Sequence, residues 1–347
     1  MNAPPRGPLW PVLAARLRNR GLLRVVVGLY LLAVLVLAVL IDRFGDRWWP
    51  ATTLLFAPRW IWGVPLAVLV PLAFGRERAL LAPLAAAALL MLGPILDLRL
   101  PVARLARSGP APRGRLRVMT YNVGGGGVDP FALGVLLRAA APDVVTLQER
   151  DGPVVEPPHS VALETQCNGE LCLLSRFRIK SADIRDRADL LAKHGSGSMI
   201  RYEIETPHGV VSVLNVHLAT VRDGLAAVMR RAWRGAPALE ANTRERALES
   251  SIARGWAERA GGAPLLVMGD FNMPVESAIY RSWWSPLTNA FSAAGLGFGG
   301  SKRTRWHGLR IDHILVGPGW RVERAWMGEG LGGDHRPMFA ELSYVGP

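Results

Sequence analysis

Acidic, amide and imidazole side chains follow short apolar segments at several points in the second half of the chain. Residues 265–268 are all apolar and lead into Gly269-Asp270-Phe271-Asn272, and a later glycine turn delivers Asp334 and His335. Groups fixed at rigid strand ends suit metal-assisted chemistry better than groups on a mobile loop. Further apolar segments carry Asn122, Glu149, His217 and Asp312. One such residue alone is typical of a turn or a helix cap, so the ordered set carries the prediction.

This ordered set resembles the endonuclease/exonuclease/phosphatase superfamily of metal-dependent phosphoesterases. The matching motifs are Tyr-Asn at 121–122, Gln-Glu at 148–149, Asn-x-His-Leu at 215–218, Gly-Asp-Phe-Asn at 269–272, Ile-Asp-His-Ile at 311–314 and Asp-His at 334–335. Together they cover about residues 115 to 345. The resemblance implies an α/β fold, the four-layer α/β/β/α sandwich of DNase I-like proteins, and short apolar segments between helical ones agree with it.

The same resemblance implies a divalent metal site. It assigns the principal ligand to Glu149, gives Asn122 the task of holding metal-bound water or a neighbouring carboxylate, and puts Asp334 close to the metal. Hard cations take oxygen ligands, so we expect Mg²⁺, with Mn²⁺ as the alternative. A surface Glu149 paired with Arg150 is the competing interpretation.

Catalytic roles also follow from the resemblance. Asp270 would orient or deprotonate the attacking water, and Asn272 would stabilise the pentacovalent state. His335, polarised by Asp312, would contact the phosphoryl oxygens. His217 matches a histidine of DNase-like and sphingomyelinase-like members, and a histidine there can protonate a leaving group of high pKa.

The N-terminal part has the composition of a membrane domain. Half of the whole chain is hydrophobic although its net charge is +13. Residues 25–41 and 79–96 contain no charge, and with flanking apolar residues each approaches the hydrocarbon thickness of about 30 Å. We therefore expect N-terminal transmembrane helices before the sandwich: a membrane domain at 1–98 with two or three spans at about 22–41, 51–75 and 79–98, a linker at 99–114, and a catalytic domain at 115–347 that is active without the membrane domain.

The middle apolar segment is the least regular of the three. Pro58, Arg59 and Pro65 interrupt it. Proline is tolerated in membrane helices and Arg59 could extend toward an interface, which favours a third span over a re-entrant segment. A cleaved signal peptide is disfavoured, because the first apolar stretch exceeds the h-region of about 7 to 15 residues.

Two observations bear on orientation. Arginines before residue 25 and at 76 and 78 favour a cytoplasmic N-terminus and, with three spans, an extracytoplasmic catalytic domain, whereas the arginines at 99–117 oppose it. Cys167 and Cys172 flank an Asn-Gly turn and could form a disulfide, which persists only in oxidising compartments; two unrelated thiols are the alternative. We expect a multi-pass protein of the bacterial cytoplasmic membrane with an extracytoplasmic catalytic domain.

The basic composition would suit either nucleic acid or an anionic membrane. Arg230, Arg231 and Arg234 surround an aromatic residue and could contact lipid headgroups or substrate, or form an ordinary solvated helix face. The architecture resembles small three-span bacterial members linked with teicoplanin resistance, thought to act on lipid pyrophosphates. This implies hydrolysis of a phosphodiester or pyrophosphate bond in a lipid-linked substrate. A membrane-tethered nuclease acting on DNA and a non-catalytic binding protein are the alternatives, and no protein partner is indicated.

Overall fold

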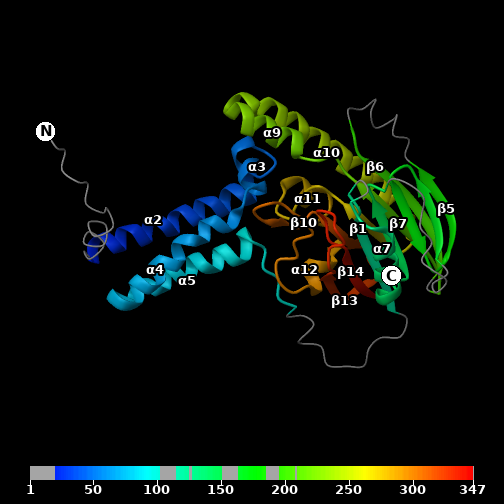
Figure 1. The fold of residues 1–347 in the computed structure, drawn as a ribbon, viewed down its shortest axis with the longest axis horizontal. Helices are drawn as coiled ribbons and strands as arrows, with labels where there is room; N and C mark the ends of the chain where they lie inside the picture. The colour runs from blue at the N-terminus through cyan, green and yellow to red at the C-terminus, as the bar shows by residue number, and fades with distance from the viewer. Residues whose placement is uncertain are drawn as a thin grey trace.

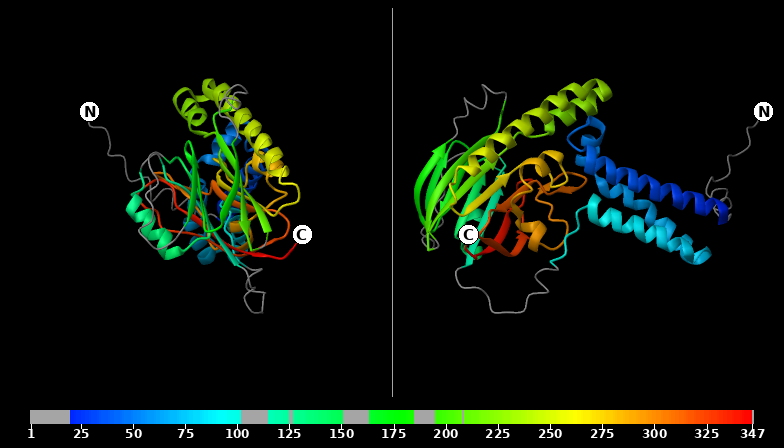
Figure 2. Two further views of the ribbon diagram at one scale, coloured as in Figure 1. Left: turned by 90° about the vertical axis from the view of Figure 1, so that its right-hand side faces the viewer. Right: turned by 180° about the vertical axis from the view of Figure 1, so that it is seen from behind.

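The computed structural model describes residues 20–101, 115–124, 127–150, 163–184, 195–207 and 209–346. Two parts are visible in Figure 1. Residues 20–98 form a rod of helices, the helical arm, and residues 115–346 form a layered α/β body. The arm projects from one end of the body, as the right-hand view of Figure 2 also shows.

The helical arm runs toward the body, away from it and back again (Figure 1). At the end far from the body, an ion pair of 2.7 Å between Arg24 and Glu77 links the beginning of the arm to the point where the chain turns back toward the body. In chain order its elements are α2 (Arg20–Val39), η1 (Leu40–Phe44), α3 (Trp49–Phe56), η2 (Arg59–Gly63), α4 (Val64–Arg76), η3 (Arg78–Leu80), α5 (Leu81–Leu90) and η4 (Met91–Ile95).

Two helices of the arm are long and apolar enough to cross a membrane, those over Arg20–Phe44 and Arg78–Ile95. The segment expected as one helix at about 51–75 is instead divided, because α3 and the η2–α4 helix meet at 86°. Ala57 at the break is extended, with ψ 165°, as a residue before proline usually is. The pair could make a third span only as a broken one.

Two six-stranded sheets form the centre of the body. The first has the order β13-β14-β1-β2-β4-β3 and the second β5-β6-β7-β8-β12-β9. Their strands are β1 (Arg115–Asn122), β2 (Val144–Gln148), β3 (Glu164–Asn168), β4 (Leu171–Ser175), β13 (Trp320–Met327) and β14 (Met338–Tyr344), and then β5 (Arg178–Ile184), β6 (Ser198–Thr206), β7 (Gly209–His217), β8 (Leu265–Asp270), β9 (Thr288–Asn289) and β12 (Asp312–Val316). A small ribbon consists of β10 (Lys302–Arg303) and β11 (Gly308–Leu309).

The sheets face each other across one apolar core to which both contribute, for example Val118 and Val213. The outer faces carry helices. Leu133 of α7 (Pro130–Ala140) packs on the first sheet, and Trp256 of α10 (Ala236–Glu258) packs on the second. The expected four-layer α/β/β/α sandwich is confirmed. The remaining helices are α9 (Arg222–Arg231), η5 (Ala232–Gly235), α11 (Ala278–Trp283) and α12 (Ala290–Ala294).

Strand directions bring the expected site residues to one edge of the sandwich. The parallel pairs β1–β2 and β7–β8 end there, whereas β12 is antiparallel to β8 and begins there, with Asp312 opposite Asp270. At this edge β7 and β8 approach so closely that a Cβ on Gly269, whose φ is 146°, would lie 1.9 Å from the carbonyl oxygen of Val216. Only glycine fits immediately before Asp270.

Arm and body are joined by buried polar contacts as well as apolar ones. Asp46 and Arg246 form a 2.6 Å ion pair, and both side chains are fully buried. Arg59 forms a 2.6 Å ion pair with Glu276 of the body, so it does not extend toward an interface as expected. Arg99, the first linker residue, pairs through its backbone with Gly297. The part of the linker that the structure describes is therefore docked on the body.

Candidate active site

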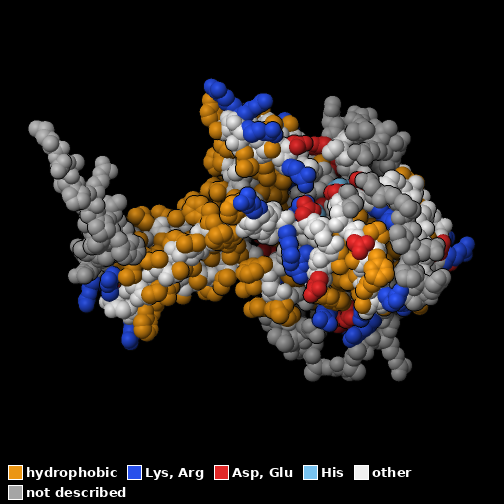
Figure 3. All heavy atoms as spheres, viewed as in Figure 1, with side chains coloured by type: hydrophobic (Ala, Val, Ile, Leu, Met, Phe, Trp, Pro, Cys, Tyr) orange, Lys and Arg blue, Asp and Glu red, His pale blue; other side chains and the backbone are white. Residues whose placement is uncertain are grey.

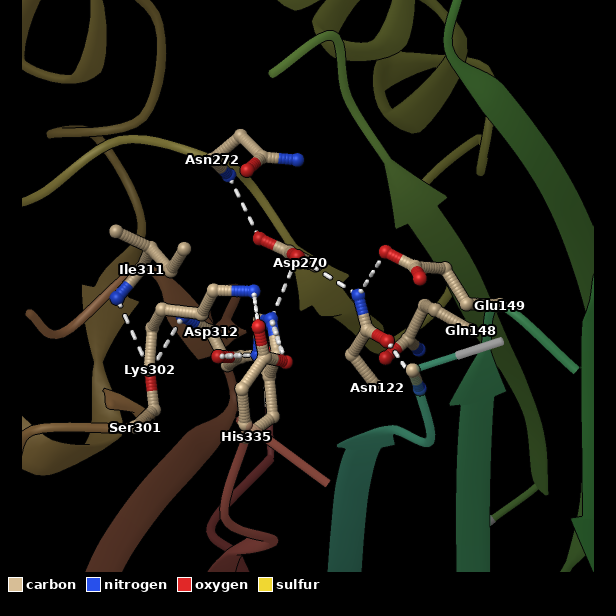
Figure 4. A network of polar contacts seen from close by, with 12 residues as sticks. Asn122, Gln148, Glu149, Asp270, Asn272, Ser301, Lys302, Ile311, Asp312 and His335 are labelled. Carbon is tan, nitrogen blue, oxygen red and sulfur yellow. Dashed lines mark hydrogen bonds and ion pairs between the residues drawn. The ribbon is translucent and has the colours of Figure 1, made fainter. Parts of the chain in front are cut away.

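The polar residues at this edge lie on the strands β1, β7, β8 and β12 and in the segments just after β2, just after β8 and before β14, and Figure 4 shows most of them. Asn122, His217 and Asp270 end β1, β7 and β8, and Asp312 begins β12. Glu149 and Asn272 follow strand ends directly and both have φ near +50°, an uncommon conformation for residues other than glycine. Non-glycine residues in this region cluster at functional sites.

Asn122 is buried at the centre of the site. Its Nδ2 donates to Oε1 of Glu149 at 2.8 Å and to Oδ2 of Asp270 at 2.9 Å, while its Oδ1 accepts from the backbone N–H of Gly124. A neutral amide thus holds two carboxylates close together without adding charge. Two adjacent carboxylates repel each other unless a cation or a proton lies between them.

Two groups of side chains could hold a metal ion. Glu149, His217 and Asp270 offer atoms within 4.8 Å of one another, and so do Asp270, Asp312 and His335. The oxygen donors of Glu149 and Asp270 suit a hard divalent cation. Glu149 is about one third exposed at 35%, so a cation bound there would be within reach of a substrate. The chemistry of this donor set fits the Mg²⁺ or Mn²⁺ that the sequence implies.

His217 lies between carboxylates. Its Nδ1 donates to Oε1 of Glu170 at 3.0 Å, and its Nε2 lies 3.4 Å from Oε1 of Glu149. Burial would lower the pKa of His217, but the Glu170 hydrogen bond and the charges of Asp270, Glu170 and Glu149 raise it to about 9. Without a bound cation His217 is therefore protonated at neutral pH and can give up a proton.

Glu170 was not identified from the sequence. It lies between β3 and β4, whose residues Cys167 and Cys172 are opposite one another and joined by a disulfide. The disulfide therefore closes the hairpin that carries Glu170. The sequence signal is the acidic residue inside Cys-Asn-Gly-Glu-Leu-Cys, a segment for which the sequence predicts a turn and a possible disulfide but no site residue.

His335 is buried beside Asp312. Its Nδ1 donates to Oδ2 of Asp312 at 2.8 Å, and its Nε2 lies 3.7 Å from Oδ2 of Asp270. Burial lowers the pKa of His335, but the charge and hydrogen bond of Asp312 and the charge of Asp270 outweigh it and give a pKa of about 8. Asp312 is itself held by the hydroxyl of Ser301, which accepts its backbone N–H. The pair therefore presents a fixed imidazolium next to Asp270.

Asp270 is 1% exposed and accepts the backbone N–H of Asn272 at 2.8 Å. Burial and the charge of Asp312 raise the pKa of Asp270, while His335 and His217 act in the opposite direction. A raised pKa makes a carboxylate a better proton acceptor. The Nδ2 of Asn272 donates to the carbonyl oxygen of Leu218, which fixes its amide at the edge of the site.

Asp334, expected to lie close to the metal, is 3.8 Å from Nε2 of His335 through its Oδ1. Its carboxylate is half exposed and lies 2.5 Å from Nζ of Lys302. Burial raises the pKa of Asp334, but Lys302 lowers it more, so the group is ionised and paired. Among the described residues it belongs to neither candidate metal group. Lys302 follows no motif and was not identified from the sequence.

A cavity of about 350 Å³ opens over these groups. It is lined by Glu149, Glu170, His217, Asp270, Asn272, Lys302 and His335, and also by Arg222. Another wall is apolar and includes Phe56 of the helical arm together with Val221, Leu225, Leu309 and Ile311. Glu249 fixes a third wall by accepting three backbone N–H groups, those of Ser196, Gly197 and Ala219.

Arg230, Arg231 and Arg234 do not line this cavity. They are exposed at the turn between α9 and α10, which extends away from the sheets and along the arm (Figure 1). The cations that do reach the cavity are Arg222, at the opposite end of α9, and Lys302. Helical spacing alone could not indicate which end of α9 faces the site.

Comparison with known proteins agrees with the geometry. Residues 119–335 match the model of the Endonuclease/Exonuclease/phosphatase family. The chain belongs to this family. A comparison with curated protein sequences finds no match.

Solved structures of this family share the fold of the α/β body. One is an endonuclease/exonuclease/phosphatase from Beutenbergia cavernae DSM 12333, with 17% identity over 67% of this chain and 72% of that chain and a TM-score of 0.51. Humanized D. rerio TDP2 has 15% identity over 66% of this chain and 99% of that chain, with a TM-score of 0.52. D. rerio TDP2 complexed with a single-strand DNA product has 15% identity, the same coverage and a TM-score of 0.50. The body therefore has a phosphoesterase- and nuclease-type fold.

Proposed function

We propose that this protein is a divalent-metal-dependent phosphoesterase that hydrolyses a phosphodiester or pyrophosphate bond in a lipid-linked substrate at a membrane surface. The observation that carries the proposal is the composition of the catalytic cavity. Phe56 of the apolar helical arm lines the same cavity as Glu149, Asp270 and His335. The cavity would thus offer polar groups to a phosphate and, beside them, an apolar wall to a hydrocarbon chain.

The polar residues divide the chemistry among them. A divalent cation held by Glu149, with Asn122 and Asp270 beside it, would polarise the phosphoryl group. Asp270 orients a water and accepts its proton, since its buried carboxylate has a raised pKa. The imidazolium of His335 and the amide of Asn272 stabilise charge on the phosphoryl oxygens. His217, held by Glu170, donates a proton to the leaving oxygen.

The arm supports a membrane location. Its surface is largely hydrophobic, and Lys and Arg side chains gather at the end far from the body (Figure 3). Arg20, Arg24, Arg76 and Arg78 belong to that end, which we infer to be cytoplasmic by the positive-inside rule. The body then lies outside the cytoplasm, where the Cys167–Cys172 disulfide would persist. We infer a bacterial cytoplasmic membrane protein with three spans, the middle one broken between α3 and the η2–α4 helix.

The contacts between arm and body support a lipid-linked substrate in particular. The apolar cluster of the arm extends without interruption to Val221, Leu309 and Ile311 of the cavity wall. The buried Asp46–Arg246 pair fixes this wall relative to the membrane helices. The apolar wall of the cavity is therefore continuous with the packed core of the arm, and the arm contributes to the site in addition to anchoring it.

A nuclease acting on DNA is the second candidate. It is favoured by the net charge of +13 and by the shared fold with D. rerio TDP2 complexed with single-strand DNA product. A non-catalytic binding protein is disfavoured, because the groups needed for catalysis, Glu149, His217, Asp270, Asn272 and His335, line one cavity.

The test uses full-length protein in detergent micelles with Mg²⁺. A polyprenyl pyrophosphate, sphingomyelin, a phosphoinositide and plasmid DNA are supplied in parallel, and Glu149→Gln serves as the inactive control. We expect chelator-sensitive hydrolysis of a lipid-linked phosphate that the control lacks. Cleavage of plasmid alone would favour the nuclease, and no Glu149-dependent hydrolysis of any substrate would contradict both.

A further inference from the structure

A second and larger cavity, of about 970 Å³, lies between the helical arm and the body. Trp60 and Leu96 of the arm contribute to it, as do Leu296 and Phe298 of the body. Leu296 is 70% exposed and Phe298 is 49% exposed. This interfacial cavity is distinct from the catalytic one and contains none of the catalytic residues named above.

Five arginines line the interfacial cavity: Arg59, Arg303, Arg310, Arg324 and Arg336. Two of them are neutralised, because Arg59 pairs with Glu276 and Arg310 pairs with Asp97. For the other three, no carboxylate of the described part of the chain lies within 4.0 Å. Three uncompensated cations around one cavity would attract an anion.

Two of the three unpaired guanidinium groups are held in place by other contacts. Arg324 lies over the ring of Trp326 at 4.7 Å, and Nε of Arg336 donates to the carbonyl oxygen of Gly328 at 2.8 Å. Burial and the neighbouring charge of Arg303 lower the pKa of Arg336, partly offset by Glu329. An anion between Arg303 and Arg336 would relieve this repulsion. Arginine forks are also suited to phosphate oxygens.

The surroundings of these cations are those of a membrane interface. The cavity is bordered by η2 and by residues 96–101, where the chain passes between the arm and the body. Trp60 is 47% exposed there, at a level where tryptophan is common in membrane proteins. Exposed apolar side chains beside arginines suit a ligand that has both a phosphate and hydrocarbon.

We propose that the interfacial cavity binds an anionic phospholipid of the same membrane. Its phosphate would lie between Arg303, Arg324 and Arg336, and its acyl chains would lie along Trp60, Leu296 and Phe298. The proposal rests on the membrane location given under the proposed function but not on the reaction. The bound lipid is a resident ligand, separate from the substrate.

The choice of variants follows from two short segments between the cavities, residues 302–303 and 335–336. Lys302 and His335 pair with each other and line the catalytic cavity, whereas their neighbours Arg303 and Arg336 line the interfacial cavity. Arg336 is thus bonded directly to catalytic His335. The test therefore replaces Arg303 and Arg324 and leaves Arg336 unchanged.

Native mass spectrometry of full-length protein measures the bound lipid directly. The protein is exchanged into micelles that contain phosphatidylglycerol or phosphatidylcholine, and the retained lipid is counted after the detergent is stripped. We expect wild-type protein to retain phosphatidylglycerol in preference to phosphatidylcholine. The Arg303→Gln/Arg324→Gln variant should retain about tenfold less, and Arg303→Lys/Arg324→Lys should recover part of it. Arg230→Gln/Arg231→Gln, at the exposed turn after α9, is the matched control and should behave as wild type.

Equal retention by the Gln variant and wild type would overturn the proposal, and so would equal retention of the two lipids. Displacement of the lipid by millimolar inorganic phosphate would show a free-phosphate site instead, and displacement by an oligonucleotide would show a nucleic-acid site. The midpoint of thermal unfolding of each variant establishes that it is folded. None of these measurements depends on hydrolysis. The proposed function can therefore fail while this proposal stands, and this proposal can fail while the proposed function stands.

Discussion

Nδ1 of His217 lies 3.0 Å from Oε1 of Glu170, a residue held between two disulfide-bonded cysteines. Together with the charges of Asp270 and Glu149 this contact raises the pKa of His217. In the proposed reaction, proton donation to the leaving group therefore depends on a residue outside the family motifs. Glu170 acts through His217 and is a positioning residue.

Glu170→Gln should lower turnover by about tenfold to a hundredfold, the usual cost of losing such a supporting contact. The loss should be larger for an alkyl leaving group than for p-nitrophenolate, which leaves without a proton. The measurement is kcat for a matched pair of diesters. Equal losses for both would contradict the assignment of His217 as the proton donor.

Reduction of the Cys167–Cys172 disulfide should act in the same direction but less strongly, because it loosens the hairpin that carries Glu170. Wild-type kcat for the alkyl ester should fall in dithiothreitol, whereas that of Glu170→Gln should not fall further. If dithiothreitol lowered kcat equally in both proteins, the disulfide would not act through Glu170 and His217.

Substitutions should distinguish the loss of metal binding from the loss of water activation. Glu149→Gln removes a charge from the cation site, so affinity for Mg²⁺ and rate should fall together and excess Mg²⁺ should restore part of the rate. Asp270→Asn and His335→Ala should lose about 10² to 10⁴ in kcat with little rescue, since they remove the proton acceptor and the charge stabilisation. Activity titrated against Mg²⁺ distinguishes them. Near-normal, chelator-insensitive activity in all three would refute the metal phosphoesterase.

The junction of arm and body should depend on the buried Asp46–Arg246 pair. Arg246→Met leaves Asp46 buried without its partner and should cost about 3 to 5 kcal/mol, while the double variant Asp46→Asn/Arg246→Met should recover much of it. Thermal unfolding and limited proteolysis between arm and body measure both effects. Equal instability of the single and double variants would indicate that the pair is not what joins the two parts.

His313 should make the body sensitive to acid. It is fully buried, its Nε2 donates to the carbonyl oxygen of Met273, and burial together with Arg310 lowers the pKa of His313 to about 3. The unfolded chain takes up a proton below pH 6.5 and the folded one does not. Stability is therefore complete above pH 6.5 and falls toward pH 3, by at most about 1.4 kcal/mol per pH unit. His313→Gln should give a shallower decline in unfolding midpoint between pH 7.5 and 4.5, and parallel curves would contradict this.

The sandwich and the residues that end its strands could be predicted because the signals are local. Apolar segments followed by Asn122, Glu149 or Asp270 indicate both the strand and its edge. Glu170, Lys302 and Phe56 could not be predicted, because tertiary packing alone brings them to the cavity. That the arm is dispensable for chemistry stays a prediction, and a fragment 115–347 would lack Phe56 and would leave Arg246 without its partner.

The central claim is that the apolar wall of the catalytic cavity recognises a lipid chain. Its most direct test is the ratio of kcat/KM for a polyprenyl pyrophosphate to kcat/KM for a soluble pyrophosphate ester. We compare wild type with Leu225→Gln, which places an amide in that wall, and with Val135→Gln, an exposed position on α7 away from it. The ratio should fall on the order of tenfold in Leu225→Gln alone, as expected for polar intrusion into an apolar pocket. An unchanged ratio, or wild-type protein that cleaves only the soluble ester or DNA, would contradict the claim.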